Sequence, residues 1–331
     1  MRGKSGTGAW TLGVAAASLL ALSAALAACS RPAPVKPGGA GQTSPTPVQT
    51  PPYVLEDTEV RTLHAGALGR DYRLLVSLPP SYGQRPGHRF PVIFVTDADY
   101  GFPLLRSITR RVGDHGVGME EAVIVGLAYA QGDTPEYSRR RDYTPTASAD
   151  THLVSDMAGR PPRFGEAEGY RRFIAGTVFP FIARSYRVDM GRKIYVGHSY
   201  GALLGVDILL SDPAMFQHYL ISSPSLWYGH RVMFAREQAY AGSHKDMDAD
   251  VYMAVGGYET IRPGSSDLRY GKGVDMAADE QAFASDLASR HYPNLRLAVE
   301  TIPGEDHLTV APISFTHGLI RALGLRADRT P

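Results

Sequence analysis

The sequence is poor in cysteine and has no excess of charge of either sign. Among its 331 residues there is a single cysteine, Cys29, so no disulfide can form within the chain and no Cys-His zinc pattern is present. The formal net charge is +1, with arginine and lysine scattered apart from the run at residues 139–141. Binding to nucleic acid needs a basic face that neutralises phosphates, so no nucleic-acid partner is expected. Nothing in the sequence indicates a metal or an organic cofactor.

Long apolar runs are equally scarce after residue 28, where no stretch reaches the roughly 18 residues needed to cross a bilayer. The N-terminus differs, because basic Arg2 and Lys4 precede Trp10–Ala28, which is almost wholly apolar or small. This pattern is typical of a signal peptide. Leu26-Ala27-Ala28-Cys29 resembles a bacterial lipobox, in which the cysteine is acylated and becomes the mature N-terminus. A plain signal peptide, or a membrane anchor with an incidental cysteine, is the alternative.

Three segments are therefore expected: a lipoprotein-type signal peptide at 1–28, a lipidated Cys29 with a linker to residue 52, and a folded domain at 53–331. The linker is rich in Pro, Gly, Thr, Ser and Gln and shows no apolar periodicity. On this interpretation the protein is exported and faces the periplasm or the cell surface. It would contact the membrane only through its lipid anchor.

Strand patterns alternate with helical patterns along the folded part. Short β-branched runs such as Phe90–Thr96 and Ala122–Ala128 predict strands buried on both faces, and Gly169–Arg187 has apolar residues at helical spacing, with a kink expected at Pro180. This alternation predicts an α/β fold with a mainly parallel central sheet and helices on both faces. Residues 133–168 show little periodicity and predict a long functional loop, such as a lid or substrate wall.

The strongest chemical motif is Gly197-His198-Ser199-Tyr200-Gly201, which fits the G-x-S-x-G nucleophile elbow. This turn exposes a serine hydroxyl between a strand and a helix. Here an apolar strand ends at Gly197 and an apolar helix starts near Ala202, so the context agrees with the motif. Ser199 is the predicted nucleophile, and the predicted architecture is the α/β-hydrolase fold.

A serine hydroxyl needs a base to take its proton, and in this fold the order along the chain is Ser, acid, His. His307 follows the last predicted strand and is the predicted base. Glu259, after the strand at 251–255, is the predicted acid that orients the imidazole. Asp275 and Asp306 are alternatives, and a Ser-His dyad without an acid stays open.

Two backbone N–H groups are needed to stabilise the negative oxygen that develops during ester cleavage. Tyr200, directly after the nucleophile, is expected to supply one. The second is expected from Asp99, or from Ala98, in the loop after the strand at 90–96.

Several segments together resemble one family, the esterases of the α/β-hydrolase fold, and within it the branch of periplasmic enterobactin and salmochelin esterases. They are VTDADY at 95–100, RRRDYTP at 139–145, residues 179–188 leading into the elbow, SSPSLW at 222–227 and GEDH at 304–307. The chain departs from many members in having Ala202 where they have a second glycine, and the acid is the family's least regular element. The resemblance implies hydrolysis of a small-molecule ester, with a ferric siderophore as the candidate substrate. Feruloyl esterases, acetyl-xylan esterases and mycolyl transferases belong to the same family, so the acyl donor and acceptor stay open.

Candidate substrate-binding residues are Arg139 and Arg141, whose forked donors suit an anionic group, and the aromatic side chains Tyr100 and Trp227. A solvated charge run and core aromatics are the alternatives. The prediction is a serine carboxylesterase that acts through an acyl-enzyme. A non-catalytic ligand-binding lipoprotein of the same fold and an acyltransferase with the same triad are the competing hypotheses.

Overall fold

The computed structural model describes residues 52–147 and 153–324. The predicted signal peptide and Cys29, and all but the last residue of the predicted linker, lie outside this part of the chain. The strands are β1 (Thr58–Ala65), β2 (Arg70–Ser77), β3 (Phe90–Val95), β4 (Val123–Ala130), β5 (Val188–His198), β6 (His218–Ser222), β7 (Ala249–Gly256) and β8 (Leu295–Ile302). The helices are α1 (Ala98–Arg111), α2 (Pro135–Tyr143), α3 (Ala167–Phe173), α4 (Phe179–Ser185), α5 (Tyr200–Ser211), α6 (Tyr228–Ser243), α7 (Met276–Ser289) and α8 (Val310–Leu323).

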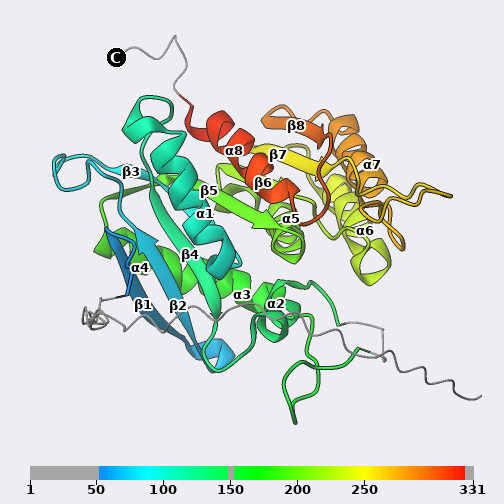
Figure 1. The fold of residues 1–331 in the computed structure, drawn as a ribbon, viewed down its shortest axis with the longest axis horizontal. Coiled ribbons are helices and arrows are strands. Elements are labelled where there is room, and N and C mark those ends of the chain that lie inside the picture. The colour runs from blue at the N-terminus through cyan, green and yellow to red at the C-terminus, as the bar shows by residue number, and fades with distance from the viewer. Residues whose placement is uncertain (1–51, 148–152, 325–331) are drawn as a thin grey trace, which may run out of the picture. The chain divides into compact units, whose positions relative to one another are not determined.

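One sheet holds the eight described strands in the order β1-β2-β4-β3-β5-β6-β7-β8. The pairs β1–β2 and β2–β4 are antiparallel, whereas every pair from β4 to β8 is parallel. The mainly parallel sheet predicted from the alternation of strands and helices is therefore confirmed. Its parallel part brings the carboxyl ends of β3 and β5–β8 to the same edge (Figure 1).

Burial along each strand follows its position in the sheet. All six residues of β3 are buried, which explains its continuous apolar sequence. All eight residues of β7 are also buried, although its sequence includes Asp250. Residues of β1 and β8, at the two outer positions, are mostly exposed or partly buried. A continuous apolar run thus marks a strand that is buried on both faces.

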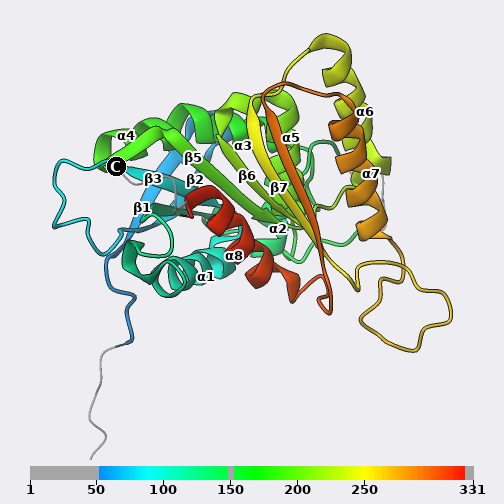
Figure 2. The same cartoon turned by 90° about the horizontal axis from the view of Figure 1, so that it is seen from above.

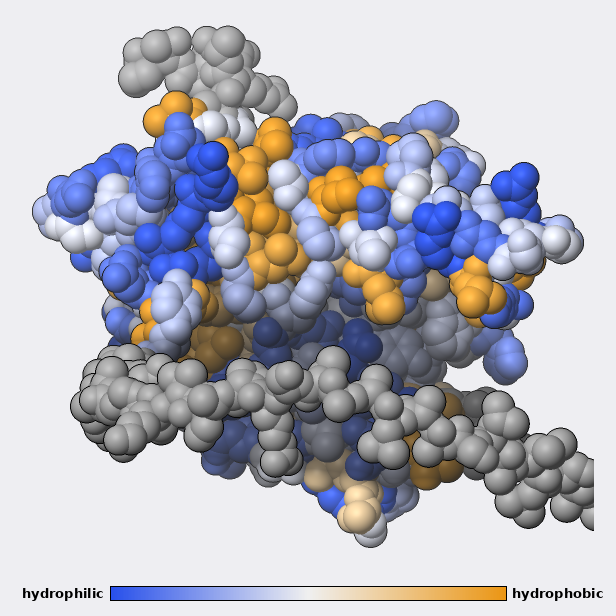
Figure 3. Space-filling model, viewed as in Figure 1, coloured by the Kyte–Doolittle hydropathy of each residue, from blue (hydrophilic) through white to orange (hydrophobic). Residues whose placement is uncertain are grey.

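Helices cover both faces of the sheet, as predicted (Figure 2). The core on one face contains residues of α1 and α8, including Phe102 and Phe315. The core on the other face contains residues of α3 to α7, among them Leu203 and Phe283. In the view of Figure 3, hydrophobic residues gather over the middle of the face that carries α1 and α8, with polar residues to either side.

The segment at 133–168 is not the continuous loop that its polar sequence predicts, because it contains α2. The Thr134 side chain accepts a hydrogen bond from the N–H of Tyr137 at 3.2 Å, and Pro135 occupies the first turn. The buried face of this helix is formed largely by charged and hydroxyl side chains, which carry no apolar periodicity. The helices α1 and α6 were likewise not predicted.

The helical segment predicted at 169–187 is present, and it is irregular just before Pro180, where the sequence predicts a kink. One π-type turn, Ile174–Val178, joins α3 to α4, and Pro180 is the second residue of α4. The wider turn accommodates a residue that has no N–H to donate. No helix in the described ranges is long and apolar enough to cross a membrane.

Candidate active site

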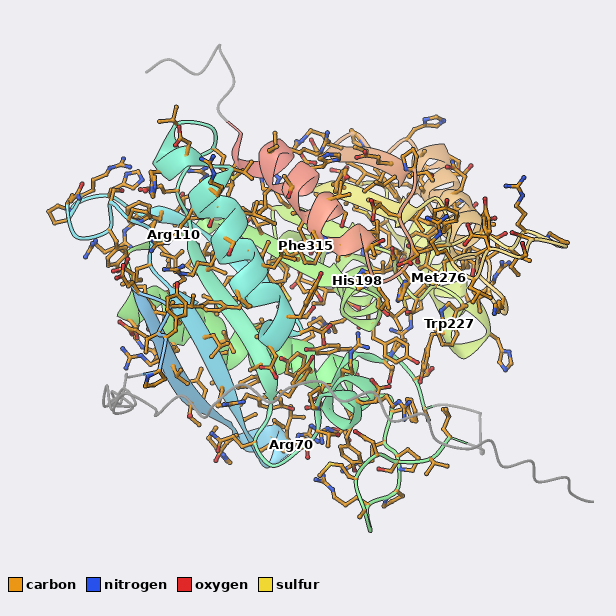
Figure 4. The ribbon with its side chains drawn as sticks, viewed as in Figure 1. Arg70, Arg110, His198, Trp227, Met276 and Phe315 are labelled. Carbon is orange, nitrogen blue, oxygen red and sulfur yellow. The ribbon has the colours of Figure 1, made fainter. Side chains whose placement is uncertain are left out.

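The three residues predicted to form the proton relay follow three strands of the parallel half of the sheet. Ser199 follows β5, Glu259 follows β7, and His307 follows β8. Because these strands are parallel, their carboxyl ends meet at one edge, which is where sites form in open α/β sheets. His198 and Trp227, labelled in Figure 4, lie on this side of the molecule.

The backbone at Ser199 has the strained geometry of a nucleophile elbow. Its φ is +58° and its ψ is −119°, a conformation that non-glycine residues rarely adopt. The two flanking glycines make the turn possible. A Cβ at Gly197 would lie 2.5 Å from the carbonyl carbon of Gly201, and one at Gly201 would lie 2.2 Å from Thr96 Oγ1. The helix α5 then begins at Tyr200, so the serine stands at the helix N-terminus.

A chain of hydrogen bonds joins the serine, the imidazole and the carboxylate. The distance from Ser199 Oγ to His307 Nε2 is 3.0 Å, and that from His307 Nδ1 to Glu259 Oε2 is 2.7 Å. An ionised carboxylate only accepts hydrogen bonds, so Nδ1 carries the proton in the neutral imidazole. Nε2 is then free to accept the proton of the serine hydroxyl, which is the arrangement that activates a serine nucleophile.

Glu259 is held rigidly, with 4% of its surface exposed. Its Oε1 accepts hydrogen bonds from Ser223 Oγ at 2.6 Å and from the N–H of Gly256 at 2.8 Å. Oε2 is therefore the oxygen left for His307. Its partners at Oε1 fix the carboxylate plane, so the side chain presents one defined oxygen to the imidazole.

The loops that carry the acid and the base are bonded directly to each other. The N–H of Gly257 donates to Ile302 O at 2.8 Å, and the N–H of Tyr258 donates to Glu305 O at 2.9 Å. We call this pair of bonds the loop clamp. A Cβ at Gly256 would lie 2.5 Å from Glu305 O, so only glycine permits this close approach. The loop clamp therefore fixes the position of the loop that carries Glu259 relative to the loop that carries His307.

Beyond the loop clamp, the chain between β7 and α7 projects away from the sheet (Figure 2). A β-bridge joins Ile261 to Gly271, and Leu268, between them, is 79% exposed. Asp275 closes this loop and caps α7, because its Oδ1 accepts from the N–H of Ala278 at 2.9 Å. Its Oδ2 accepts from Thr260 Oγ1 at 2.9 Å.

Neither alternative acid is bonded to the imidazole in the described part of the chain. Asp275 is engaged at the N-terminus of α7, as above. Asp306 Oδ1 accepts from the N–H groups of Leu308 at 2.9 Å and Thr309 at 3.1 Å. Of the three carboxylates considered, Glu259 alone meets His307.

His198 packs against the imidazole of His307, with ring centroids 4.7 Å apart. Burial, then repulsion from His307 and Arg139, lowers the pKa of His198 to about 3. Its Nδ1 lies 3.2 Å from Ser222 Oγ. The ring is therefore neutral near pH 7 and adds no charge beside the proton relay.

The oxyanion donors are placed differently from the prediction in one respect. Tyr200 is the first residue of α5, so its N–H has no acceptor within the helix, as expected for a donor directly after the nucleophile. Asp99, however, lies in the first turn of α1 and not in a loop. Its N–H, like that of Ala98, belongs to a helix N-terminus that faces the site from the end of β3. Asp97 precedes them with a φ of +49°.

Of the predicted substrate residues, Arg141 is wrongly assigned. Its surface is 0% exposed, and its guanidinium bonds to Asp133 at 2.6 Å and Asp142 at 2.8 Å. A group so enclosed cannot reach a ligand at the serine. The sequence placed Arg141 close to Arg139, but residues two apart on a helix point in different directions, so only one of them faces the site.

Arg139 lies at the site but is already paired. Its Nε and Nη2 donate to the carboxylate of Asp97 at 3.2 and 3.3 Å, and its guanidinium lies 5.3 Å from the ring centroid of Tyr200. Trp227 is 37% exposed, with its ring centroid 6.1 Å from that of Tyr200, and Tyr100 is 48% exposed. These two aromatic residues are available to a ligand.

Three site residues were not singled out from the sequence: Asp97, Ser223 and Ser225. Asp97 also accepts from Tyr129 Oη at 2.7 Å, and Ser225 Oγ lies 3.4 Å from Ser199 Oγ. Ser223, which holds Glu259, has a φ of +46°. The two serines belong to the SSPSLW segment directly after β6, so a polar cluster at a strand end was the available signal. In the described ranges no group of His, Cys, Asp and Glu is arranged to hold a metal ion.

Comparisons with known proteins identify the family of this chain. The sequence matches the "Putative esterase" family over residues 65–290. Ferri-bacillibactin esterase BesA of Bacillus subtilis is 28% identical over 277 residues, covering 82% of this chain and 91% of the relative. The siderophore triacetylfusarinine C esterase of Aspergillus fumigatus is 27% identical over 294 residues, covering 83% and 94%.

Among solved structures, the BES protein from Bacillus cereus superposes with a TM-score of 0.69 at 24% identity, covering 84% of this chain and 100% of that one. The siderophore hydrolase EstA of Aspergillus nidulans gives a TM-score of 0.65 at 21% identity, covering 83% and 98%. The chain belongs to the "Putative esterase" family, and it is an ester-hydrolysing enzyme with the α/β-hydrolase fold.

Proposed function

We propose that the protein is a serine esterase that forms an acyl-enzyme at Ser199, with His307 as general base and Glu259 as the orienting acid. The observation that carries this proposal is the continuous hydrogen-bond chain from Ser199 Oγ to Glu259 Oε2 through the imidazole. The strained φ at Ser199 supports it, because such a conformation persists where the surroundings enforce it.

In the first half of the reaction, His307 Nε2 takes the hydroxyl proton while Ser199 Oγ attacks the ester carbonyl carbon. Negative charge then develops on the carbonyl oxygen, where the N–H of Tyr200 and an N–H at the start of α1 would stabilise it. The tetrahedral intermediate collapses, the alkoxy group leaves with the proton from His307, and the acyl group stays on Ser199. Water then repeats the sequence and releases the acid.

We propose siderophore-type esters as the substrate class. The named relatives act on such esters, and exposed aromatic rings at Tyr100 and Trp227 suit the aryl groups of an aromatic siderophore. Arg139 would add positive charge at the site for an anionic ferric complex, although its pairing with Asp97 partly neutralises it.

The test uses the purified protein with a fluorophosphonate probe and a short p-nitrophenyl ester. Wild type should be labelled and turn over the ester, and Ser199→Ala should do neither. Ser225→Ala is the matched control, because it removes a hydroxyl 3.4 Å from Ser199 Oγ and should keep labelling. Wild-type protein that binds ester but is never labelled would instead be a non-catalytic binding protein.

A second measurement addresses the substrate. Initial rates would be compared for a ferric catecholate trilactone, a feruloyl ester and an acetylated xylo-oligosaccharide, with added alcohol to detect acyl transfer. We expect the highest kcat/KM for the trilactone, with the free acid as product. A faster feruloyl or acetyl ester would contradict the substrate class, and transfer to alcohol in place of water would identify an acyltransferase.

We also propose that acylated Cys29 tethers the exported protein to a membrane, because the only cysteine follows the lipobox-like Leu26-Ala27-Ala28. Expression of the full chain with a palmitate analogue should label wild type in the membrane fraction. Cys29→Ser should lose the label, and a variant labelled as strongly as wild type would contradict the proposal.

A further inference from the structure

A polar cavity lies at the opposite end of the strands from Ser199. It has a volume of about 410 Å³. Four of its residues come from successive strands, β5 to β8, and the others come from the C-terminal end of α8. The lining residues are Arg192, His218, Asp250, Arg296, Arg321, Ala322 and Gly324. We call it the amino-end pocket.

Strand register explains why these side chains meet. His218 of β6 is paired with Asp250 of β7, and Asp250 is paired with Arg296 of β8, so the three stand in a row across the sheet. On β5 the residue paired with His218 is Ile194, and Arg192, two residues earlier, points to the same face. This is the face covered by α8, and Arg321 completes the row from that helix.

Asp250 holds Arg296 and Arg321 in place through hydrogen bonds. It is 8% exposed and accepts from Arg296 Nε at 3.1 Å and from Arg321 Nε at 2.9 Å. Both guanidinium groups are therefore held by Nε. Their terminal nitrogens make no hydrogen bond to any other described residue, so each arginine retains donors for a ligand. An arginine fork of this kind suits planar or tetrahedral oxyanions.

The charge of the amino-end pocket is positive. Arg192 is balanced by Glu120, to which its Nη1 donates at 2.9 Å, and Asp250 balances one of the other two arginines. One positive charge remains when His218 is neutral. Burial lowers the pKa of His218, and repulsion from Arg296, Arg192 and Arg321 lowers it further against the attraction of Asp250. An added anion would relieve this repulsion.

We propose that the amino-end pocket binds a small phosphate-type oxyanion at a site separate from the serine centre. Its volume falls in the range of small-ligand sites, but its lining of charged side chains suits an anion and not an apolar molecule. Asp250 and Gly256, at the other end of β7, are six residue steps apart, a span of about 20 Å at 3.3 Å per residue. The ligand therefore cannot touch the ester. The proposal goes beyond the esterase function and does not depend on it.

Two sources supply this chemistry: a free phosphate or pyrophosphate, and the phosphodiester headgroup of a lipid. The full-length protein in zwitterionic micelles would be titrated by calorimetry at constant ionic strength. The probes are inorganic phosphate, pyrophosphate and the short-chain lipid dihexanoylphosphatidylglycerol. Binding of the inorganic anions alone identifies a soluble ligand, and binding of the lipid alone identifies a headgroup site. Binding of both supports the shared chemistry, and binding of none overturns the proposal.

The variants are Arg296→Gln and Arg321→Gln, made singly so that Asp250 keeps one arginine partner. Each removes charge-assisted hydrogen bonds to the anion, and we expect binding to weaken about 10- to 100-fold. Arg172→Gln is the matched control, because this arginine is 72% exposed and forms an ion pair with Glu168 on α3. Equal affinity in wild type and both pocket variants would overturn the proposal.

A measurement on wild type keeps the test valid if a variant does not fold. Because an anion beside His218 stabilises its protonated form, pyrophosphate should raise the pKa of His218 in a histidine NMR titration. Assignment uses His218→Gln, which lacks the shifting signal. An unchanged His218 titration at saturating pyrophosphate would contradict binding in the amino-end pocket.

Discussion

The substitution Glu259→Gln is expected to disturb the orientation of His307 without changing the stability of the loop that holds residue 259. Glutamine keeps the shape of the side chain, so its Oε1 can still accept from Ser223 Oγ and the N–H of Gly256. Its amide group must then face His307 Nδ1, where Oε2 now lies at 2.7 Å. Because the amide only donates there, Nδ1 becomes an acceptor and the ring proton moves to Nε2.

A proton on Nε2 faces Ser199 Oγ, which is 3.0 Å away, and the ring can no longer take the hydroxyl proton. A change to the wrong tautomer of this kind in a serine protease lowers kcat by about 10⁴. That factor corresponds to about 5 kcal/mol in the activation free energy. We expect a loss of this size here, with thermal stability close to that of wild type because both hydrogen bonds to Oε1 persist.

The assay is the steady-state hydrolysis of a p-nitrophenyl ester, with Tm measured on the same preparations. Asp275→Asn is the matched control, since this carboxylate caps α7 and is bonded to Thr260 and Ala278. It should cost about 1 kcal/mol of stability and leave the rate essentially unchanged. Full activity in Glu259→Gln, or loss of activity in Asp275→Asn alone, would refute the assignment of the acid.

At the elbow, Gly201→Ala would place a methyl group 2.2 Å from a neighbouring hydroxyl oxygen, so kcat and Tm should both fall. Gly242→Ala is the control, because a methyl group at this position on α6 meets no neighbouring atom and should stabilise the fold by about 0.5–1 kcal/mol. Burial lowers the pKa of His198 to about 3, so the unfolded chain takes up this proton first. The free energy of unfolding should therefore fall below about pH 6.5 by up to about 1.4 kcal/mol per pH unit, and His198→Gln should flatten this slope in denaturant titrations. Arg141→Met removes a buried guanidinium that bonds to Asp133 and Asp142 and should cost about 3–5 kcal/mol. Exposed Arg172→Met should change the unfolding free energy by no more than about 0.5 kcal/mol, and equal losses would contradict the burial argument.

The sequence predicts the inner strands well because they are buried on both faces. Phe90–Val95 is wholly apolar, and the structure has a strand over those residues. The elbow was equally visible, since its glycines are required by the close approach of Gly197 to Gly201. The position of His307 followed from its place after the last strand.

Features that depend on buried polar side chains could not be predicted from the apolar pattern of the sequence. The helix α2 buries Arg141 and Asp142, so its inner face has the composition of a surface. The partner of Glu259 at Ser223 is 36 residues away in the chain, and the row in the amino-end pocket depends on strand register. Such pairings are set by three-dimensional proximity, and no local pattern encodes them.

The loop clamp divides the chain after β7 into a part that is fixed and a part that is free to vary. Glu259 lies on the inner side, within two residues of bonds that tie it to the His307 loop. Residues 262–270 lie past the Ile261–Gly271 bridge, with Leu268 largely in solvent. Insertions or replacements there would leave the proton relay with its present geometry. The length and sequence of this exposed loop tip can therefore change while the catalytic residues stay in place.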